Sequence, residues 1–244
     1  MILAIDVGNT RIKSAVFEQN TLIELFVFYK KDFVKKIQNI LKKYSNIHNL
    51  IISSVGKIEE SDFLELKKLT NVVFINQFSH FPFENLYSTP LTLGIDRMVL
   101  AGGSVLVYPN KNRLVIDAGT CVTYDYINDK NQYLGGAISP GLRLRYESLN
   151  NFTAKLPLLT LQNPDDFIGN STSQSIHSGV VNGLLNEIIG FVNQFEANNS
   201  NFIIILTGGD ADFLAKRLKN TIFANSNFLL ESLNFIYIYN SKND

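Results

Sequence analysis

Two short stretches of the chain place an acid, a glycine and a hydroxyl at the end of an apolar strand. The first is Asp6 to Thr10, which follows the apolar residues 2–5, and the second is Asp117 to Thr120, which follows residues 114–116. Backbone amides and a threonine hydroxyl at such a turn can bind phosphate, while the acid can hold a hydrated divalent cation. Taken alone, the first stretch is equally compatible with an ordinary hairpin whose Asp starts the turn.

The repetition of the pattern favours a function over an ordinary turn. The two acids lie a little under half the chain apart, as internal duplication of a domain would give. A chain of 244 residues with 45% hydrophobic content can form two cores. We therefore expect an N-terminal domain over residues 1–112 and a C-terminal domain over residues 113–244, with the two corners facing across a cleft that holds the phosphates of a nucleotide.

A third candidate site begins at Gly94, after a long segment, residues 76–93, that carries Tyr87 and shows no clear period. Asp96 and Arg97 stand at the expected start of a helix. Asp96 can cap that helix. It can alternatively accept a proton in a polar pocket where Arg97 binds an anion.

The bulk composition excludes some function classes. Lys plus Arg equals Asp plus Glu at 22 each, so we expect no binding to nucleic acid or to an anionic membrane. The sequence shows neither an export signal nor a long apolar run, and a cytoplasmic location is expected. The single cysteine, Cys121, is expected to be a buried small hydrophobe, and His177 a surface or interface residue, with no zinc site.

The elements that must position these residues follow from hydrophobic periodicity. Apolar runs predict strands at residues 2–5, 11–17, 21–29, 50–54, 72–75, 114–116, 121–126, 132–138 and 202–206. Helical spacing predicts helices at residues 32–44, 59–69, 96–107, 142–152 and 172–195. This order is typical of α/β sheets with helices on both faces.

Three further segments have open interpretations. Gly135, Gly136, Pro140 and Gly141 are expected to form a turn, which either approaches a ligand or serves only a tight bend. The glycine pair at residues 208–209 either lets a nucleoside pass close to the backbone or is an ordinary strand-to-helix turn. The apolar segment 228–239 is expected to pack on the second domain.

With these motifs in place, the chain resembles the type III pantothenate kinases, a branch of the acetate and sugar kinase, heat-shock chaperone and actin superfamily. The resemblance covers nearly the whole chain. It is carried by residues 6–13, Tyr87, Pro90, 93–97, 117–120, 135–141, 154–157, Gly169 and Thr172. The family usually has Asn where this chain has Thr89 and Ala where it has Cys121. The resemblance implies two duplicated ribonuclease-H-like (actin-like ATPase) domains.

The resemblance also implies a reaction, the transfer of the γ-phosphoryl group of ATP to pantothenate as the first step toward coenzyme A. Asp96 is then the general base, Asp6 orients hydrated Mg²⁺, and Asp117 binds a monovalent cation such as K⁺ or NH₄⁺. The implied ATP-binding residues are Asp6, Val7, Gly8, Asn9, Thr10, Arg11, Ile12, Lys13 and Thr120. The implied pantothenate-binding residues are Tyr87, Gly94, Ile95, Asp96, Arg97 and Thr172.

Glycines in the helix over residues 172–195 permit close approach, so we expect a homodimer built largely on that helix, unless its apolar face is buried in its own domain. The resemblance implies that Thr172 reaches the substrate pocket from the dimer partner. Two alternatives to this function stay open. A different small-molecule kinase of the same fold would change the region of Tyr87 and residues 94–97. A non-catalytic regulator of this fold would be expected to lack one of the acids Asp6, Asp96 and Asp117, and all three are present.

Overall fold

The computed structural model describes residues 1–8, 11–54, 60–218 and 222–243, so Asn9 and Thr10 of the first motif lie outside the described residues. The chain forms two compact units. The first contains residues 1–109 and 227–244, and the second contains residues 110–226.

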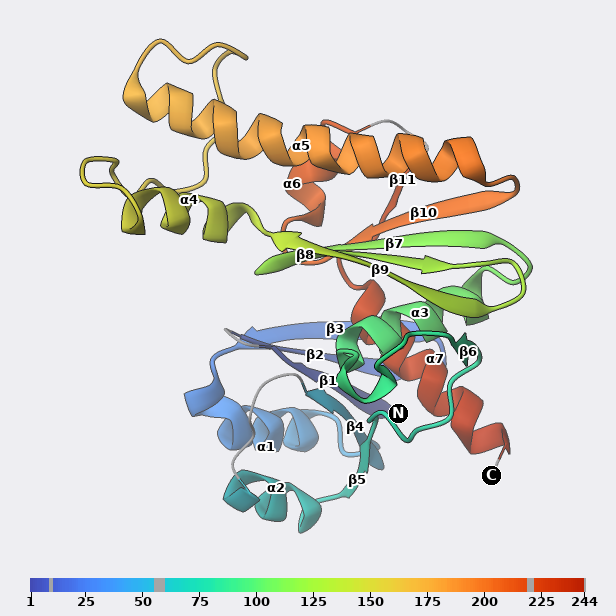
Figure 1. The fold of residues 1–244 in the computed structure, drawn as a ribbon. Helices are drawn as coiled ribbons and strands as arrows, with labels where there is room; N and C mark the ends of the chain where they lie inside the picture. Colours follow the sequence, from blue (N-terminus) through green and yellow to red (C-terminus); the bar gives the residue numbers. More distant parts are fainter. Residues whose placement is uncertain (9–10, 55–59, 219–221, 244) are drawn as a thin grey trace. The chain divides into compact units, whose positions relative to one another are not determined.

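The first unit is built on a mixed sheet (Figure 1). Its elements are β1 (Ile2–Val7), β2 (Ile12–Glu18), β3 (Thr21–Phe28), the 3₁₀ helix η1 (Lys30–Asp32), α1 (Phe33–Lys43), β4 (Asn49–Ser54), α2 (Glu60–Lys67), β5 (Asn71–Phe74), β6 (Glu84–Asn85), the 3₁₀ helix η2 (Pro90–Thr92), α3 (Ile95–Val107) and α7 (Phe228–Asn243). The main strands lie in the order β3-β2-β1-β4-β5, with β1, β2 and β3 antiparallel and β4 and β5 parallel to β1.

Strand β1 shows how alternation assigns its residues to two faces. Leu3, Ile5 and Val7 share a buried cluster with α1, whose Phe33, Ile37 and Ile40 are also buried. Because successive side chains of a strand point to opposite faces, Asp6 lies on the other face, which α3 and α7 cover in part. The acid therefore ends a strand whose opposite face is anchored in the core.

The second unit repeats this plan. Its elements are β7 (Asn112–Ala118), β8 (Cys121–Ile127), β9 (Gln132–Pro140), α4 (Leu142–Asn151), α5 (Thr172–Asn198), β10 (Phe202–Thr207), α6 (Ala211–Ala215) and β11 (Ile222–Ala224). The order β9-β8-β7-β10-β11 matches β3-β2-β1-β4-β5, with β7, β8 and β9 antiparallel and β10 and β11 parallel. The predicted mixed α/β fold, duplicated within the chain, is confirmed.

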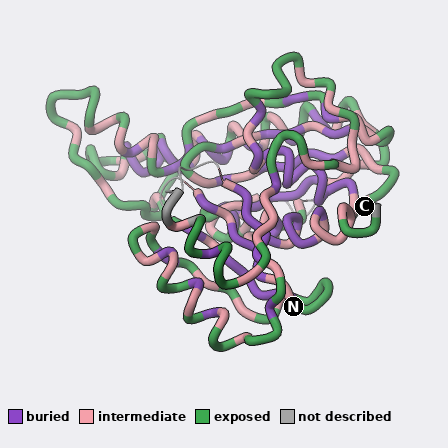
Figure 2. The backbone as a smooth tube through the Cα atoms, turned by 90° about the horizontal axis from the view of Figure 1, so that it is seen from below, coloured by how far each residue is buried: buried purple, intermediate pink, exposed green. Residues whose placement is uncertain are grey.

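Helix α5 covers one face of the second sheet. Leu184 and Ile188 of α5 pack in one buried cluster with Leu114 and Ile116 of β7. The next residue along β7, Asp117, therefore points to the opposite face, as Asp6 does in β1. Figure 2 colours the chain by burial, with buried residues in purple and exposed residues in green.

The C-terminal segment differs from its predicted position. Helix α7 packs on α3, β1 and β4, so it belongs to the first unit, and the expectation that residues 228–239 pack on the second domain is wrong. A Cβ at Gly103 would collide with Ser232, so the missing side chain permits this close approach of α3 and α7. The domain boundary expected between residues 112 and 113 stays a prediction.

The expected turn at residues 135–141 is also wrong for most of its length. Gly135, Gly136 and Pro140 lie within β9. Gly135 has a φ of 103°, next to a register shift between β8 and β9, and only glycine adopts such a conformation at little cost. Gly141 alone follows the strand, where it precedes α4.

Two single-residue expectations are corrected as well. Cys121 is exposed because it begins β8 directly after the second turn. His177 is only 5% exposed, and its Nδ1 lies 2.8 Å from the hydroxyl oxygen of Tyr146. The apolar spacing of α5 predicted which side of the helix faces the core. It could not show that Tyr146 of α4 pairs with the imidazole.

Candidate functional site

The first acid corner forms where β1 meets its two neighbouring strands. Asp6 is paired with Lys13 on antiparallel β2 and with Ser53 on parallel β4. Paired positions of adjacent strands share a face, so the carboxylate, the ammonium and the hydroxyl lie on the same face. A Cβ at Gly8 would lie 3.1 Å from the carbonyl oxygen of Arg11, so glycine keeps the turn tight.

The remaining predicted members of this motif differ in what their side chains can do. Val7 and Ile12 are each 1% exposed and belong to the core with α1, so only their backbones can serve a ligand. Arg11 is exposed, with its guanidinium 5.9 Å from the ring centroid of Tyr29. Lys13 is thus the cation of this stretch that the register places beside Asp6.

The second corner has the same construction. Asp117 is paired with Thr123 on antiparallel β8 and with Thr207 on parallel β10. The hydroxyl of Thr207 occupies the position that Ser53 occupies beside Asp6. Both hydroxyl oxygens are buried, and neither has a hydrogen-bond partner among the described residues.

Two segments distant in sequence close on this second corner. Gly208 has a φ of 98°, and a Cβ there would collide with Ala118 O and Asp117 Oδ1. The amide of Asp210 donates to Ala118 O at 2.9 Å. On the other side, Gly141 N donates to Thr120 O at 3.0 Å. The fold thus brings the glycine pair at residues 208–209 and the end of β9 to the same turn.

The candidate base lies in the first turn of α3, in the first unit. Gly94 holds the N-cap position, and the carboxylate of Asp96 accepts a hydrogen bond from Arg97 N at 2.8 Å. A Cβ at Gly94 would lie 2.5 Å from Asp96 Oδ1, so glycine leaves room for the acid to fold back. Burial raises the pKa of Asp96, although the hydrogen bond and the charge of Arg97 oppose that rise. Asp96 therefore bonds a first-turn amide without being the N-cap itself.

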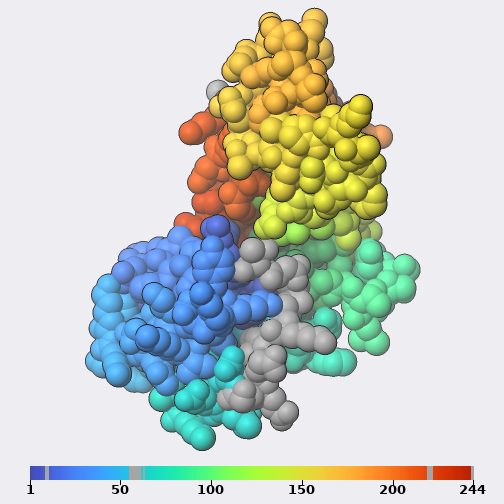
Figure 3. Space-filling view, turned by 90° about the vertical axis from the view of Figure 1, so that its left-hand side faces the viewer, coloured from blue at the N-terminus to red at the C-terminus, as the bar shows by residue number. Residues whose placement is uncertain are grey.

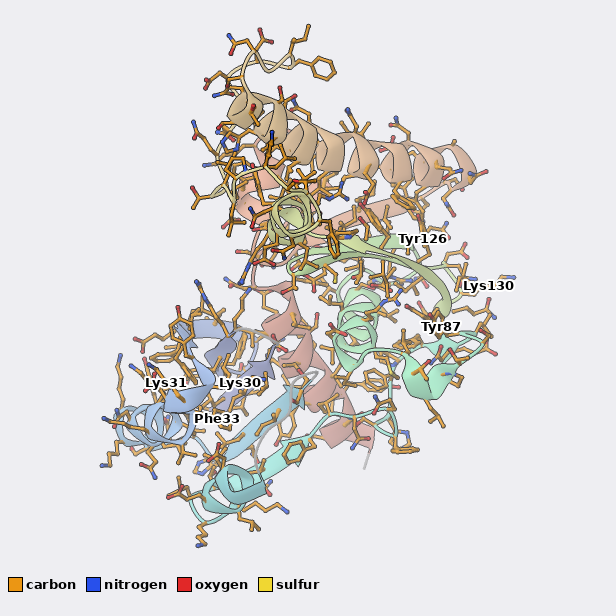
Figure 4. The ribbon with its side chains drawn as sticks, turned by 60° about the vertical axis from the view of Figure 1, so that its left-hand side comes forward. Lys30, Lys31, Phe33, Tyr87, Tyr126 and Lys130 are labelled. Atoms are coloured by element: carbon orange, nitrogen blue, oxygen red, sulfur yellow. The ribbon has the colours of Figure 1, made fainter. Side chains whose placement is uncertain are left out.

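Arg97 supplies the cation of this site. Its residue is 5% exposed, and its guanidinium lies 5.9 Å from the ring centroid of Tyr87, a distance typical of a cation–π contact. Tyr87 comes from the segment between β5 and α3 (Figure 4). Ile95 is buried, so its side chain serves the core and only its backbone can reach a ligand.

Thr172 begins α5 and is exposed. Ser171 caps the helix, since its hydroxyl accepts from Gln174 N at 3.3 Å. Thr172 lines an open hollow of about 770 Å³, whose other lining residues are Leu149, Leu156, Gly169, Asn170, Ser171, Ser175, Ile176 and Gly179. Its walls thus come from α4, from the segment before α5 and from α5 itself.

The structure distributes the predicted site between its units. Asp6, Tyr87, Asp96 and Arg97 belong to the first unit, whereas residues 117–120 and Thr172 belong to the second. The expectation that the two acid corners face one another across a cleft stays a prediction. The buried hydroxyls beside the acids were missed, because the register of parallel strands cannot be read from local sequence.

Within the described ranges, no group of three or more His, Cys, Asp or Glu residues is placed to hold a metal ion. Each helix described is too short or too polar to span a bilayer.

Known proteins resemble this chain over its whole length. The sequence model of the type III pantothenate kinase family matches residues 2–194. A type III pantothenate kinase of Flavobacterium johnsoniae is 62% identical over 244 residues, which cover 100% of both chains. One from Christiangramia forsetii is 48% identical over 98% of this chain and 99% of its own.

Solved structures show the same fold at low identity. A Campylobacter jejuni protein described as a Baf family transcriptional activator has a TM-score of 0.67 at 21% identity, covering 99% of this chain and 100% of its own. The activator of 2-hydroxyisocaproyl-CoA dehydratase from Clostridium difficile, with bound ADPNP, has a TM-score of 0.57 at 9% identity, with 99% and 96% covered. The full-length sequence similarity, on a fold that repeats the acid corner, shows that this chain belongs to the type III pantothenate kinase family.

Proposed function

We propose that this protein transfers the γ-phosphoryl group of ATP to the primary hydroxyl of pantothenate, the first step of coenzyme A synthesis. The observation that carries the proposal is the repeated corner, in which Asp6 and Asp117 end equivalent strands beside buried hydroxyls. Phosphoryl transfer depends mainly on positioning and on neutralising charge, and a pair of such corners supplies both. Because the reaction draws on ATP, a cytoplasmic location is part of this proposal.

Asp96 acts as the general base in this proposal. Its carboxylate takes the proton of the substrate hydroxyl while the hydroxyl oxygen bonds to the γ-phosphorus, and the bond from that phosphorus to the ADP oxygen breaks. Burial raises the pKa of Asp96 and so brings its basicity closer to that of an effective proton acceptor. Arg97 and Tyr87 bind the acceptor, with Arg97 pairing the carboxylate of pantothenate. The backbone at Gly94 and Ile95 lines the same pocket.

The first motif holds the phosphates of ATP. Backbone amides of residues 6–13 and the side chains of Asn9, Thr10 and Lys13 are the proposed donors, and Thr120 adds a hydroxyl from the second unit. The pairing of Lys13 with Asp6 across β1 and β2 supports this role. The side chains of Val7 and Ile12 take no part, because both are buried in the core.

The residues at both corners fit cations. An acid beside a buried hydroxyl that has no hydrogen-bond partner among the described residues offers hard oxygen ligands, as Mg²⁺ and K⁺ require. Asp6, with Ser53, would orient a hydrated Mg²⁺, and Asp117, with Thr207, would hold K⁺ or NH₄⁺. These cations supply charge neutralisation for the phosphates.

The active form in this proposal is a homodimer joined through α5. Gly179, Gly183 and Gly190 share one face of the helix, and a Cβ at each would meet open space. Phe152, Phe167 and Ile168, which lie before α5, are 88%, 71% and 79% exposed. Open space at these glycines, together with large exposed apolar groups in the segments that precede α5, favours a second copy as the missing neighbour. Thr172 would then reach the pantothenate pocket of the partner.

A substrate panel tests the proposed function. ADP release should be measured with ATP and, in turn, pantothenate, acetate, glycerol and hexoses. Release that depends on pantothenate alone supports the proposal. Release with another acceptor identifies a different small-molecule kinase, and ATP binding without turnover on any acceptor identifies a non-catalytic regulator.

A further inference from the structure

Arg145 of α4 joins the end of β9 to helix α5. Its Nε donates to Pro140 O at 2.8 Å, and its Nη2 donates to Ser139 Oγ at 2.8 Å. The same Nη2 donates to Glu187 Oε2, at 2.5 Å. The planar guanidinium thus connects three groups with fixed relative directions, which the ammonium of a lysine cannot do.

Glu187 is anchored at its other oxygen. Oε1 accepts from the hydroxyl of Tyr124 on β8 at 2.8 Å, and the Tyr124 ring stacks on Phe191 with centroids 4.0 Å apart. Burial raises the pKa of Glu187, but hydrogen bonds from Ser139, Arg145 and Tyr124 outweigh it and leave the pKa below its ordinary value. Burial also raises the pKa of Tyr124, so the phenol keeps its proton and donates.

The end of β9 that Arg145 holds packs directly against the second phosphate turn, Gly119–Thr120. Pro140 is paired with Cys121, and Ser139 with Val122, in the antiparallel register of β8 and β9. Directly after them, Gly141 N donates to Thr120 O at 3.0 Å. A Cβ at Gly141 would collide with the carbonyl oxygens of both residues of the turn, so the two segments lie in direct contact. A shift of residues 139–141 therefore displaces Thr120.

The ion pair of Arg145 and Glu187 is not needed merely to join α4 to α5. Tyr146 of α4 and His177 of α5 form a second polar link between these helices, at 2.8 Å. Leu142 and Leu184 belong to the apolar cluster that also joins them. The Arg145 and Glu187 side chains are 21% and 26% exposed, and such a partly buried ion pair contributes little net stability after its desolvation cost. Figure 3 shows α4 and the segment after it, in yellow to gold, at the surface of the second unit.

We propose that Arg145 and Glu187 are positioning residues that hold the Gly119–Thr120 turn in the geometry that binds the phosphates of ATP. The inference rests on the phosphate-binding role of Thr120 in the proposed function. Arg145 and Glu187 thus affect the affinity for the nucleotide. Pantothenate binding and the proton transfer at Asp96 do not depend on this pair.

The test is steady-state kinetics of Arg145→Lys and Glu187→Gln in the full chain. Arg145→Lys keeps the charge opposite Glu187 but loses the simultaneous bonds to Pro140 and Ser139. We expect the KM for ATP to rise about tenfold, which is about 1.4 kcal/mol, with kcat and the KM for pantothenate within about twofold of wild type. Glu187→Gln should shift the same parameter, and the double variant should lose less than the product of the two effects.

Two matched variants separate positioning from general loosening. Arg143→Lys changes the neighbouring ion pair of α4, in which Arg143 Nε lies 2.6 Å from Glu147 Oε1 on the exposed side. Tyr146→Phe removes the hydroxyl that links the same two helices. Both should leave the KM for ATP unchanged, even where Tyr146→Phe lowers the melting temperature.

Thr120→Ala distinguishes failure of the inference from failure of the proposed function. If Thr120→Ala raises the KM for ATP and both Arg145→Lys and Glu187→Gln leave it unchanged, the positioning role is overturned and the function stands. An equal rise in Tyr146→Phe overturns it too, because loosening alone would then explain the effect. If none of these variants alters the KM for ATP, both the role of Thr120 and the inference are wrong.

Discussion

Asp117 and Thr207 are paired across parallel strands β7 and β10, as Asp6 and Ser53 are paired across β1 and β4. In each pair an acid that ends a strand stands beside a buried hydroxyl that no described residue hydrogen-bonds. Both units therefore hold an acid and a hydroxyl together, with Ser53 in the first unit and Thr207 in the second. A hydroxyl that stays buried without a protein partner is costly unless a ligand uses it.

Thr207→Val tests the monovalent-cation site. If the hydroxyl is a ligand, the variant should weaken K⁺ binding by about 1 kcal/mol, roughly fivefold. The rise in melting temperature on adding KCl should shrink by the corresponding amount, whereas the K⁺-free melting temperature should stay the same or increase. NaCl at equal ionic strength is the control. A variant with the wild-type response to KCl would remove Thr207 from the site.

Asp117→Ala should have the larger effect on the same site. Loss of the carboxylate leaves the nucleotide's negative charge without its cation, so we expect a higher KM for ATP and no dependence on K⁺, with an unchanged KM for pantothenate. Initial rates over a matrix of ATP and KCl concentrations measure both effects. Normal ATP and K⁺ dependence would exclude Asp117 as a cation ligand.

Asp96→Asn separates a base from a residue that only stabilises the helix. Asn can still accept from Arg97 N but cannot take a proton from the substrate hydroxyl. The variant should therefore fold, bind ATP and lose about 10²- to 10⁴-fold in kcat. Melting temperature and kcat should be measured on one preparation, and a stable variant with wild-type kcat would eliminate Asp96 as the base.

The pH dependence of the same pair of proteins gives an independent check. Because burial raises the pKa of Asp96 above its ordinary value of 3.8, the wild-type kcat/KM, which reports groups of the free enzyme, should fall as pH decreases, with a midpoint above that value. The contribution of Asp96 to folding stability changes with pH in the opposite direction to its contribution to activity. Protonated Asp96 is tolerated by the fold at low pH, and its contribution to stability is lost as pH rises through the folded-state pKa.

Thermal unfolding of wild type and Asp96→Asn at several pH values measures this contribution. The variant should match wild type at a pH below 3.8 and be equally or more stable at pH 7, where only the wild type carries the buried charge. A stability deficit of the variant that grows from low pH to pH 7 would contradict a raised pKa.

Gly183→Leu tests the proposed dimer. A Cβ at Gly183 meets nothing within 4 Å in the chain, so the protomer should tolerate leucine and gain helix propensity of about 1 kcal/mol. At an interface between copies of α5, the same side chain would separate the helices. Light scattering should show that the variant is a monomer. Its far-ultraviolet circular dichroism should match that of wild type.

Asp212→Leu, an exposed substitution on α6, is the control and should stay dimeric. A wild-type protein that is monomeric and fully active would contradict the dimer itself. A dimer that survives Gly183→Leu would place the interface elsewhere.

The sequence by itself determined most of the elements and the identity of the acids. Strand and helix periods are local, so alternation placed Asp6 and Asp117 at strand ends and Asp96 in the first turn of α3. The repeated turn also predicted an internal duplication of a domain. These features depend on side chains a few residues apart, which the sequence shows directly.

The tertiary structure alone decided which distant residues meet. The pairing of Asp117 with Thr207 depends on the register of parallel strands, and the link from Arg145 to Glu187 depends on how α4 packs on α5. The packing of α7 on α3 depends on contact between Gly103 and Ser232. Each of these contacts is fixed by the shape of a whole packed unit, because many local patterns are compatible with several registers and only burial of the core selects one.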